Sequence, residues 1–236
     1  MTRPRTLSSL VAVALAASLA LPGAASAKLT ELGALADADL GSCPATGPTP
    51  VPVPPDQVCQ ALTKLTGYQA KVGPDRGLYQ APADGRIVAW TIALGKPTPK
   101  QTEFFTSRYD GAALAALVVL SPGKKLVRTA AAKAPLQELM PFFGQHVQFP
   151  LDRSLPIKKG QYIGLTVPTW APAMQLGRAA DTSWRSSRDP SGCSDYTTQF
   201  GLLGKRTTAG FRCLYKGVRM TYSATFIPTP QVAAQK

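Results

Sequence analysis

The stretch Leu155-Pro-Ile-Lys-Lys-Gly-Gln-Tyr-Ile-Gly-Leu-Thr-Val-Pro-Thr-Trp170 predicts a turn followed by a buried β-strand. Its Lys-Lys-Gly sequence suits a tight polar turn, and Ile163, Leu165 and Val167 follow at every second position. Period two places these side chains on one face of a strand that packs against a core. We expect the strand to end at Val167 and a loop to begin at Pro168.

Short β-like runs separated by Gly, Pro and Asp fill most of the remaining chain. No long apolar stripe has the helical period of about 3.6 residues. Residues 85–94 are apolar on both faces and should form a central strand, with Trp90 in the core. Residues 218–226 alternate between apolar and polar, as in a strand with one buried face. The predicted strands are 60–72, 78–81, 85–94, 103–108, 115–120, 126–131, 145–149, 161–167, 198–203, 211–215 and 218–226.

Many short strands with frequent turns indicate an all-β fold, an antiparallel jelly-roll-like β-sandwich with a flexible N-terminal leader. We expect a signal peptide at 1–27 and a flexible arm with a Pro-rich segment at 28–56. The arm could instead hold a short capping helix at its start. A single β-sandwich domain is expected at 57–228, followed by a disordered tail at 229–236.

The N-terminus has the pattern of a secretory signal peptide. Arg3 and Arg5 precede an apolar run at 10–21, and Ala25-Ser-Ala27 forms a small-residue cleavage site, so cleavage is expected after Ala27. A helix that crosses a bilayer needs about 20 apolar residues, more than this run offers. We therefore expect a secreted or cell-envelope-associated protein with no transmembrane segment after signal removal. A membrane anchor retained by the mature chain is the alternative.

The predicted mature chain is basic. Without residues 1–27 it has 24 Lys and Arg against 13 Asp and Glu, a net charge of +11. Such a charge favours anionic partners, namely cell-wall polymers, acidic polysaccharides or lipid headgroups. Export argues against nucleic acid. The basic residues form dispersed singles and pairs, such as 124–125, 158–159 and 205–206, so a solvated surface without a dedicated partner is the alternative.

Four cysteines in an exported protein suggest two disulfides, for which three pairings are possible. We favour Cys43–Cys59, which would tether the Pro-rich segment, and Cys193–Cys213, which flank a Gly/Thr-rich segment. A metal site is the weaker alternative, because the chain has no CxxC sequence and one histidine. No metal or cofactor is therefore expected.

Catalytic residues have little support in the sequence. His146 is a lone histidine in or beside a strand, and no GxSxG sequence supports a serine nucleophile. Paired carboxylates for polysaccharide cleavage remain an option, because Asp or Glu side chains from distant strands can meet in a groove. Several aspartates, including Asp84 and Asp110, have turn positions, whereas Glu103 falls in a predicted strand.

Residues 168–195 form the longest stretch without a convincing β pattern, and long loops on rigid β scaffolds often carry function. An exposed Trp offers a platform for a sugar ring, and Arg recognises carboxylates or phosphates. The alternative is that both tryptophans of this stretch plug the end of the sandwich. The candidate binding residues are Trp170, Arg178, Trp184, Arg185, Arg188, Asp195 and Tyr196.

Six segments resemble those of uncharacterised secreted proteins from high-GC Gram-positive bacteria: Thr66-Gly-Tyr-Gln69, Asp84-Gly-Arg-Ile-Val-Ala-Trp90, Phe149-Pro-Leu-Asp152, Gly160-Gln-Tyr-Ile-Gly-Leu165, Val167-Pro-Thr-Trp-Ala-Pro172 and Tyr222-Ser-Ala-Thr-Phe226. The resemblance covers residues 43–228 and implies a β-sandwich but no activity. Residues 156–165 also resemble the strand before the last in jelly-roll modules of the tumour-necrosis-factor and carbohydrate-binding kind. Gln161 stands where those modules usually have Asp.

The leading hypothesis is an exported non-enzymatic β-sandwich protein that binds a cell-envelope or extracellular polymer, either an anionic polymer or a carbohydrate. The leader, the basic charge and the Trp/Arg stretch support it. The alternatives are a structural or protein-interaction module and a polysaccharide hydrolase or lyase. Fold alone does not decide among them.

Overall fold

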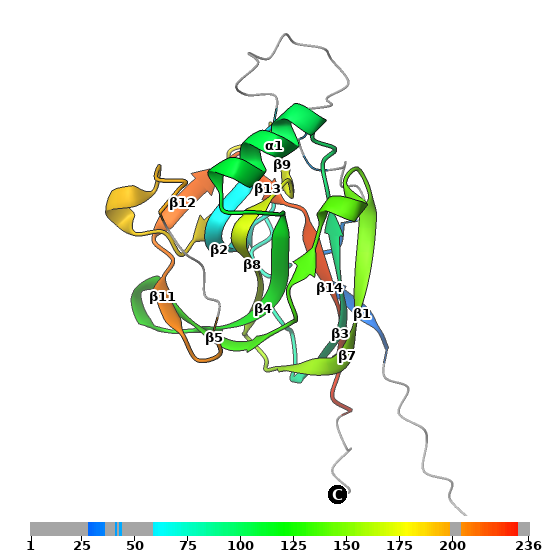
Figure 1. Cartoon of the computed structure of the whole chain (residues 1–236). Coiled ribbons are helices and arrows are strands. Elements are labelled where there is room, and N and C mark those ends of the chain that lie inside the picture. The colour runs from blue at the N-terminus through cyan, green and yellow to red at the C-terminus, as the bar shows by residue number, and fades with distance from the viewer. Residues whose placement is uncertain (1–27, 36–40, 42, 44–58, 199–203, 231–236) are drawn as a thin grey trace, which may run out of the picture.

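The computed structural model describes residues 28–35, 41, 43, 59–198 and 204–230. They form two facing antiparallel β-sheets with few helices (Figure 1), so the predicted all-β sandwich is confirmed. No helix in these ranges is long and apolar enough to cross a membrane. The expected signal peptide and the Pro-rich segment 44–56 lie outside the described residues, as do residues 231–236 of the predicted tail.

The first sheet has the strand order β1-β14-β3-β7, with bounds β1 Thr30–Leu32, β14 Tyr222–Pro228, β3 Gly85–Ala93 and β7 His146–Ile157. The second has the order β11-β5-β4-β8-β2-β10-β12, and β6 also pairs with β4. Its strands are β11 Thr208–Gly210, β5 Val127–Lys133, β4 Leu114–Pro122, β8 Tyr162–Ala171, β2 Leu62–Lys71, β10 Ser183–Ser186, β12 Cys213–Lys216 and β6 Gln137–Glu138. The ribbon β9 Met174–Gln175 with β13 Arg219–Met220 stands apart, and the helical segments are α1 Pro99–Arg108, η1 Lys124–Leu126, η2 Met140–Phe142 and η3 Pro190–Gly192.

The strands β1, β14, β3 and β7 face the strands β2, β8, β4 and β5, which is the arrangement of a jelly roll. β8 is the strand before the last of these eight, so residues 156–165 lead into the position that the jelly-roll resemblance indicated. The segment 172–221, between β8 and β14, is an insertion that supplies β9 to β13. It extends the second sheet at both of its ends.

β8 confirms the predicted strand but not its predicted end. Ile163, Leu165 and Val167 are fully buried in the core. The strand continues past Pro168 to Ala171, because Trp170 pairs with Thr63 of β2. Pro168 has no N–H to donate, and the register of the pair β2–β8 shifts at this point. A bulge therefore accommodates the proline, and the prediction of a loop at Pro168 was wrong.

Residues 103–108, predicted to be a strand, belong to helix α1. The hydroxyl of Thr98 accepts a hydrogen bond from the backbone N–H of Gln101, whose side chain accepts one from the N–H of Thr98. Pro99 follows at the first helical position. This capping box starts a helix, and it outweighs the short apolar run that suggested a strand.

The expected N-terminal arm contributes to the sandwich. Thr30–Leu32 form β1 at the edge of the first sheet, and the carboxylate of Glu31 accepts hydrogen bonds from the hydroxyls of Ser223 and Thr225. The guanidinium of Arg219 donates to the carbonyl of Ala34. The polar face expected for 218–226 is therefore partly buried. Residues 30–32, expected in the flexible arm, belong to the first sheet.

Four other strand predictions differ from the structure, and one of them is 218–226, which is divided into β13 and β14. Residues 78–81 supply an isolated bridge at Gln80, and β7 extends from the expected 145–149 to Ile157. β7 accommodates two prolines because, among the described strands, it is an edge strand that pairs with β3 only. The predicted strand 198–203 lies outside the described residues except for Thr198, which is not in a strand. Both predicted disulfides, Cys43–Cys59 and Cys193–Cys213, are present.

Candidate functional site

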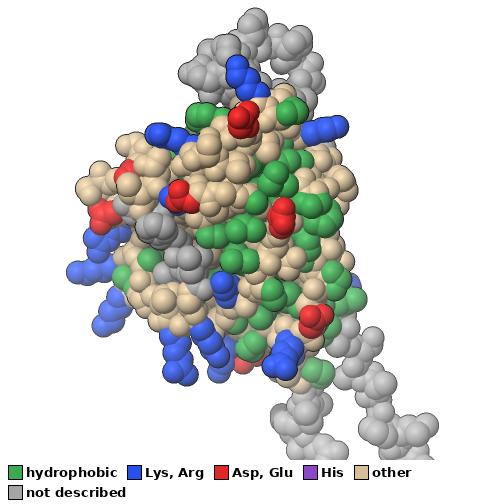
Figure 2. Space-filling view, in the orientation of Figure 1, with side chains coloured by type: hydrophobic (Ala, Val, Ile, Leu, Met, Phe, Trp, Pro, Cys, Tyr) green, Lys and Arg blue, Asp and Glu red, His purple; other side chains and the backbone are tan. Residues whose placement is uncertain are grey.

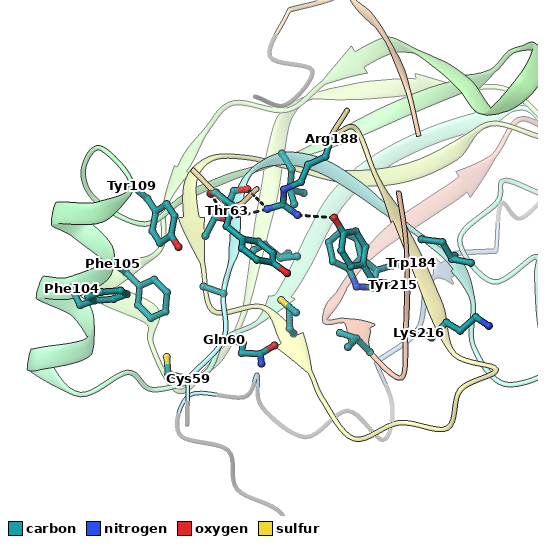
Figure 3. Close-up of a pocket in the computed structure, with 17 residues that line it drawn as sticks. Cys59, Gln60, Thr63, Phe104, Phe105, Tyr109, Trp184, Arg188, Tyr215 and Lys216 are labelled. Atoms are coloured by element: carbon teal, nitrogen blue, oxygen red, sulfur yellow. Dashed lines mark hydrogen bonds between the residues drawn. The ribbon is translucent and has the colours of Figure 1, made fainter. Parts of the chain in front are cut away.

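A cleft of about 620 Å³ lies where helix α1 faces the insertion 172–221. Figure 3 shows aromatic rings of α1 on one side and the side chains of β10 and β12 on the other. We call it the α1 cleft. Its described lining residues are Cys59, Gln60, Ala61, Leu62, Thr63, Leu65, Phe104, Phe105, Tyr109, Met174, Trp184, Arg188, Tyr196, Leu214, Tyr215, Lys216 and Val218.

The helical wall is held by Trp170. The ring of Phe105 stacks on that indole with centroids 4.9 Å apart, and Tyr109 lies next to Phe105 with centroids 5.9 Å apart. The indole Nε1 of Trp170 donates to the carbonyl of Gly111 at 3.1 Å, just beyond the helix. Trp170 therefore anchors α1 from beneath, while Phe104 on the same helix stays 56% exposed.

The opposite wall is a cross-strand aromatic pair. Trp184 of β10 lies opposite Tyr215 of β12, and their rings stack with centroids 4.3 Å apart and planes 18° apart. The hydroxyl of Tyr215 donates to the carbonyl of Cys193 at 2.6 Å. Since Cys193 is bonded to Cys213 in β12, the disulfide and this hydrogen bond fix the wall together.

Arg188 lies buried between the two walls, with 2% of its surface exposed. Its guanidinium donates to the carbonyl and hydroxyl oxygens of Thr63 at 2.8 and 3.0 Å and to the hydroxyl of Tyr215 at 3.1 Å. It also lies over the ring of Tyr196, 4.8 Å from the centroid. Neutral acceptors and a ring face thus stabilise the buried charge. Its Nε has no hydrogen-bond partner among the described residues.

Tyr196 projects from a short turn organised by Asp195. The Asp195 carboxylate accepts hydrogen bonds from the hydroxyl of Thr198 and from the backbone N–H groups of Thr197 and Thr198. These bonds hold the pKa of that carboxyl well below its ordinary value of 3.8. The backbone carbonyl of Tyr196 accepts from the hydroxyl of Thr63 at 2.9 Å. The ring of Tyr196 is therefore held at the cleft while it stays 48% exposed.

Exposed apolar side chains gather at this cleft. Five large hydrophobic side chains of the described chain are exposed, and three of them, Phe104, Tyr196 and Leu214, line it. The other two are Leu29 and Leu136. Exposed apolar surface around a concave site is typical of a binding site.

The structure brings only part of the predicted site together. Trp184, Arg188 and Tyr196 line the cleft, and Asp195 supports it from the turn, whereas Trp170 lies beneath α1. Both tryptophans are buried, so neither is an exposed platform. The predicted loop also contains β9 and β10.

The other two predicted arginines lie apart from the lining residues. Arg178 is exposed, and Arg185 is half-buried and donates to the carbonyls of Phe211 and Arg212, both at 3.4 Å. Sequence reasoning missed Phe104, Phe105 and Tyr109, because it assigned this segment to a strand. The capping sequence Thr98-Pro-Lys-Gln101 was the signal that could have found their helix.

The described lining residues of the cleft include no Asp, Glu or His, so they provide neither the carboxylate pair of glycoside hydrolysis nor a histidine base. His146 is exposed on β7, and Glu103 is exposed on α1. No group of three or more His, Cys, Asp or Glu among the described residues is arranged to hold a metal ion.

No protein-family model, curated protein or solved structure matches this chain.

Proposed function

We propose that this protein is an exported, non-enzymatic β-sandwich protein that binds an extracellular or cell-envelope polymer, and that the α1 cleft holds carbohydrate units of that polymer. The observation that carries the proposal is the gathering of exposed apolar side chains around one aromatic cleft. Two disulfides fit an extracellular location. We also propose that the protein is related to the uncharacterised secreted proteins of high-GC Gram-positive bacteria that its sequence resembles.

Carbohydrate suits the composition of the cleft. The C–H faces of a sugar ring pack on aromatic rings, and Phe104 and Tyr196 offer exposed rings from different elements. Exposed polar groups at the cleft, the amide of Gln60 and the ammonium of Lys216, can bond hydroxyl or acidic groups of a sugar. The stacked pair of buried Trp184 and half-buried Tyr215 forms the rigid wall behind them.

The test is retention of the purified protein on bacterial cell walls and on polygalacturonate at low salt. The double variant Phe104→Ala/Tyr196→Ala should bind at least about 10-fold more weakly than the wild type, because both exposed rings are lost. The matched control is Leu136→Ala, which removes an exposed apolar side chain outside the lining set and should bind as the wild type does.

Equal retention of the double variant and the wild type would overturn the proposal, as would no retention of the wild type on either material. Salt-independent capture of a single protein from an envelope extract, lost in the double variant, would instead indicate a protein-interaction module. Circular dichroism of each variant shows whether its fold is intact.

A further inference from the structure

Three basic dipeptides that are far apart in the sequence lie along one edge of the sandwich. Two of them lie in the turns β4–β5 and β7–β8, and the third lies just before β11. Figure 2 shows Lys and Arg side chains gathered at the lower left and bottom of the molecule, where Figure 1 places β11 and β5. We call these residues the basic edge: Lys124, Lys125, Lys158, Lys159, Lys205 and Arg206.

Hydrogen bonds between the three segments hold the basic edge together. The side-chain amide of Gln161, at the end of the β7–β8 turn, donates to the hydroxyl of Ser121 at 2.6 Å, close to the β4–β5 turn. The backbone N–H of Arg206 donates to the carbonyl of Ala130 in β5 at 2.7 Å. β11 then pairs with β5 over three residues. The fold therefore brings together three basic dipeptides that are far apart in the sequence.

The basic edge has little acidic compensation. The paired segments 121–134 and 204–217 together contain eight Lys and Arg and no Asp or Glu. All six residues of the basic edge are exposed, and none forms an ion pair with a described carboxylate. Asp84 lies nearby, but its carboxylate accepts from the backbone N–H of Lys159. The result is a positively charged surface that attracts anions.

Backbone conformation gives a second, independent observation. Lys125 and Arg206 have φ values of 49° and 67°, in the left-handed region where glycine costs least. Two of the three dipeptides thus place a long basic side chain where the backbone disfavours any side chain. Such strain at a surface turn is typical of a functional constraint.

We propose that the basic edge binds a linear polyanionic polymer through phosphate or carboxylate groups repeated along its chain. Exposed lysines in separate turns form a row of point charges, which suits an extended chain better than a single small anion. The inference deepens the proposed function, because it concerns the same class of polymer. It uses a different surface, so the two can fail separately.

The test measures the affinity for polyphosphate, for polygalacturonate and for neutral dextran at low and high salt. We expect binding to one or both polyanions that weakens with salt, and none to dextran. Tighter binding to polyphosphate would identify phosphate as the recognised group, and tighter binding to polygalacturonate would identify carboxylate. Tighter binding to double-stranded DNA or to anionic lipid vesicles, at equal charge concentration, would overturn the proposal.

Matched charge reversals locate the surface. Lys124→Glu/Lys125→Glu should weaken polyanion binding about 10-fold or more, whereas Lys96→Glu/Lys100→Glu, at the α1 end of the molecule, changes the net charge equally and should weaken it less than about threefold. Equal losses in the two variants would show that net charge alone is responsible and would overturn the proposal.

Glycine variants separate binding from folding. Lys125→Gly/Arg206→Gly removes two charges and relieves two strained φ values, so it should weaken polyanion binding without lowering stability. Polyanion binding by this variant equal to that of the wild type would contradict the proposal. Phe104→Ala/Tyr196→Ala should bind polyphosphate as the wild type does, because polyphosphate offers no sugar ring to the α1 cleft, even if its retention on cell walls and on polygalacturonate falls.

Discussion

Lys64 and Asp110 form an ion pair, and each has a positive φ, 45° and 63° respectively. Lys64 of β2 lies opposite the bulge of β8, where the register of the two strands shifts, and Asp110 lies just beyond the end of α1. The neighbour of Lys64, Thr63, accepts hydrogen bonds from Arg188. One irregular point in the sheet thus connects the helix wall of the α1 cleft to its buried arginine.

The substitution Asp110→Asn tests this connection. Asn tolerates a positive φ, so the variant removes the charge without straining the backbone. Because the Asp110 side chain is 73% exposed, we expect the free energy of unfolding to fall by only about 1 kcal/mol. Urea unfolding at low and high salt measures it, and the difference from wild type should shrink with salt. The exposed residue Asp152, changed to Asn, is the control.

Substitutions of Trp184 and Tyr196 should distinguish a residue of the rigid scaffold from a residue of the contact surface. Trp184 is 3% exposed and stacked, so Trp184→Ala should lower the free energy of unfolding by about 3–5 kcal/mol. Tyr196 is half exposed, so Tyr196→Ala should cost less than about 1 kcal/mol. Urea unfolding compares the two. A larger loss for Tyr196→Ala than for Trp184→Ala would contradict the assignment of Trp184 to the rigid wall.

The strands were predictable where the alternation of apolar and polar residues along the chain determined which side chains are buried. Ile163, Leu165 and Val167 face the core as their spacing indicated, and Trp90 is buried in β3 as expected. Alternation is a local property, because successive side chains of a strand point to opposite faces. The helix α1 was missed because its start depends on capping, and a few apolar residues near its centre also fit a strand.

The candidate site was only half predictable for a different reason. Trp184, Arg188 and Tyr196 stand close together in the sequence, so their grouping was visible. Their partners Phe104 and Tyr109 come from a helix about 80 residues earlier, and only the jelly-roll topology brings that helix opposite β10 and β12. Burial of Trp170 likewise depends on Phe105 stacking on it, a contact that no pattern within residues 168–195 reveals.

The Cys193–Cys213 disulfide should contribute strongly to stability. Its two cysteines are 20 residues apart, and the loop-entropy model gives about 3 kcal/mol for Cys193→Ser/Cys213→Ser. Thermal unfolding of that variant should show a midpoint about 6–12 °C lower. Cys43→Ser/Cys59→Ser, with a separation of 16, should lose nearly as much by the same model. A loss of stability in only one of the two variants would show that local contacts, and not loop-closure entropy, determine how much each disulfide stabilises the protein.

Buried tyrosines should make the protein sensitive to alkali. Burial raises the pKa of Tyr79 above 10.0, although Arg219 opposes the shift, and burial together with Tyr79 raises the pKa of Tyr222 well above that value. Below about pH 10 both states keep these protons, so the stabilisation is fully present. At higher pH the unfolded state loses them first, and the stabilisation is lost progressively as pH rises through the folded-state pKa values.

The free energy of unfolding, measured in urea at several pH values, should therefore fall above about pH 10. The hydroxyl of Tyr222 donates to the carbonyl of Ile163 at 3.0 Å, so Tyr222→Phe should cost about 1–2 kcal/mol at neutral pH. Its curve should then fall less steeply than that of the wild type, because one titrating group is gone. Tyr196→Phe, which removes an exposed hydroxyl, is the control, and parallel curves for Tyr222→Phe and the wild type would contradict the assignment.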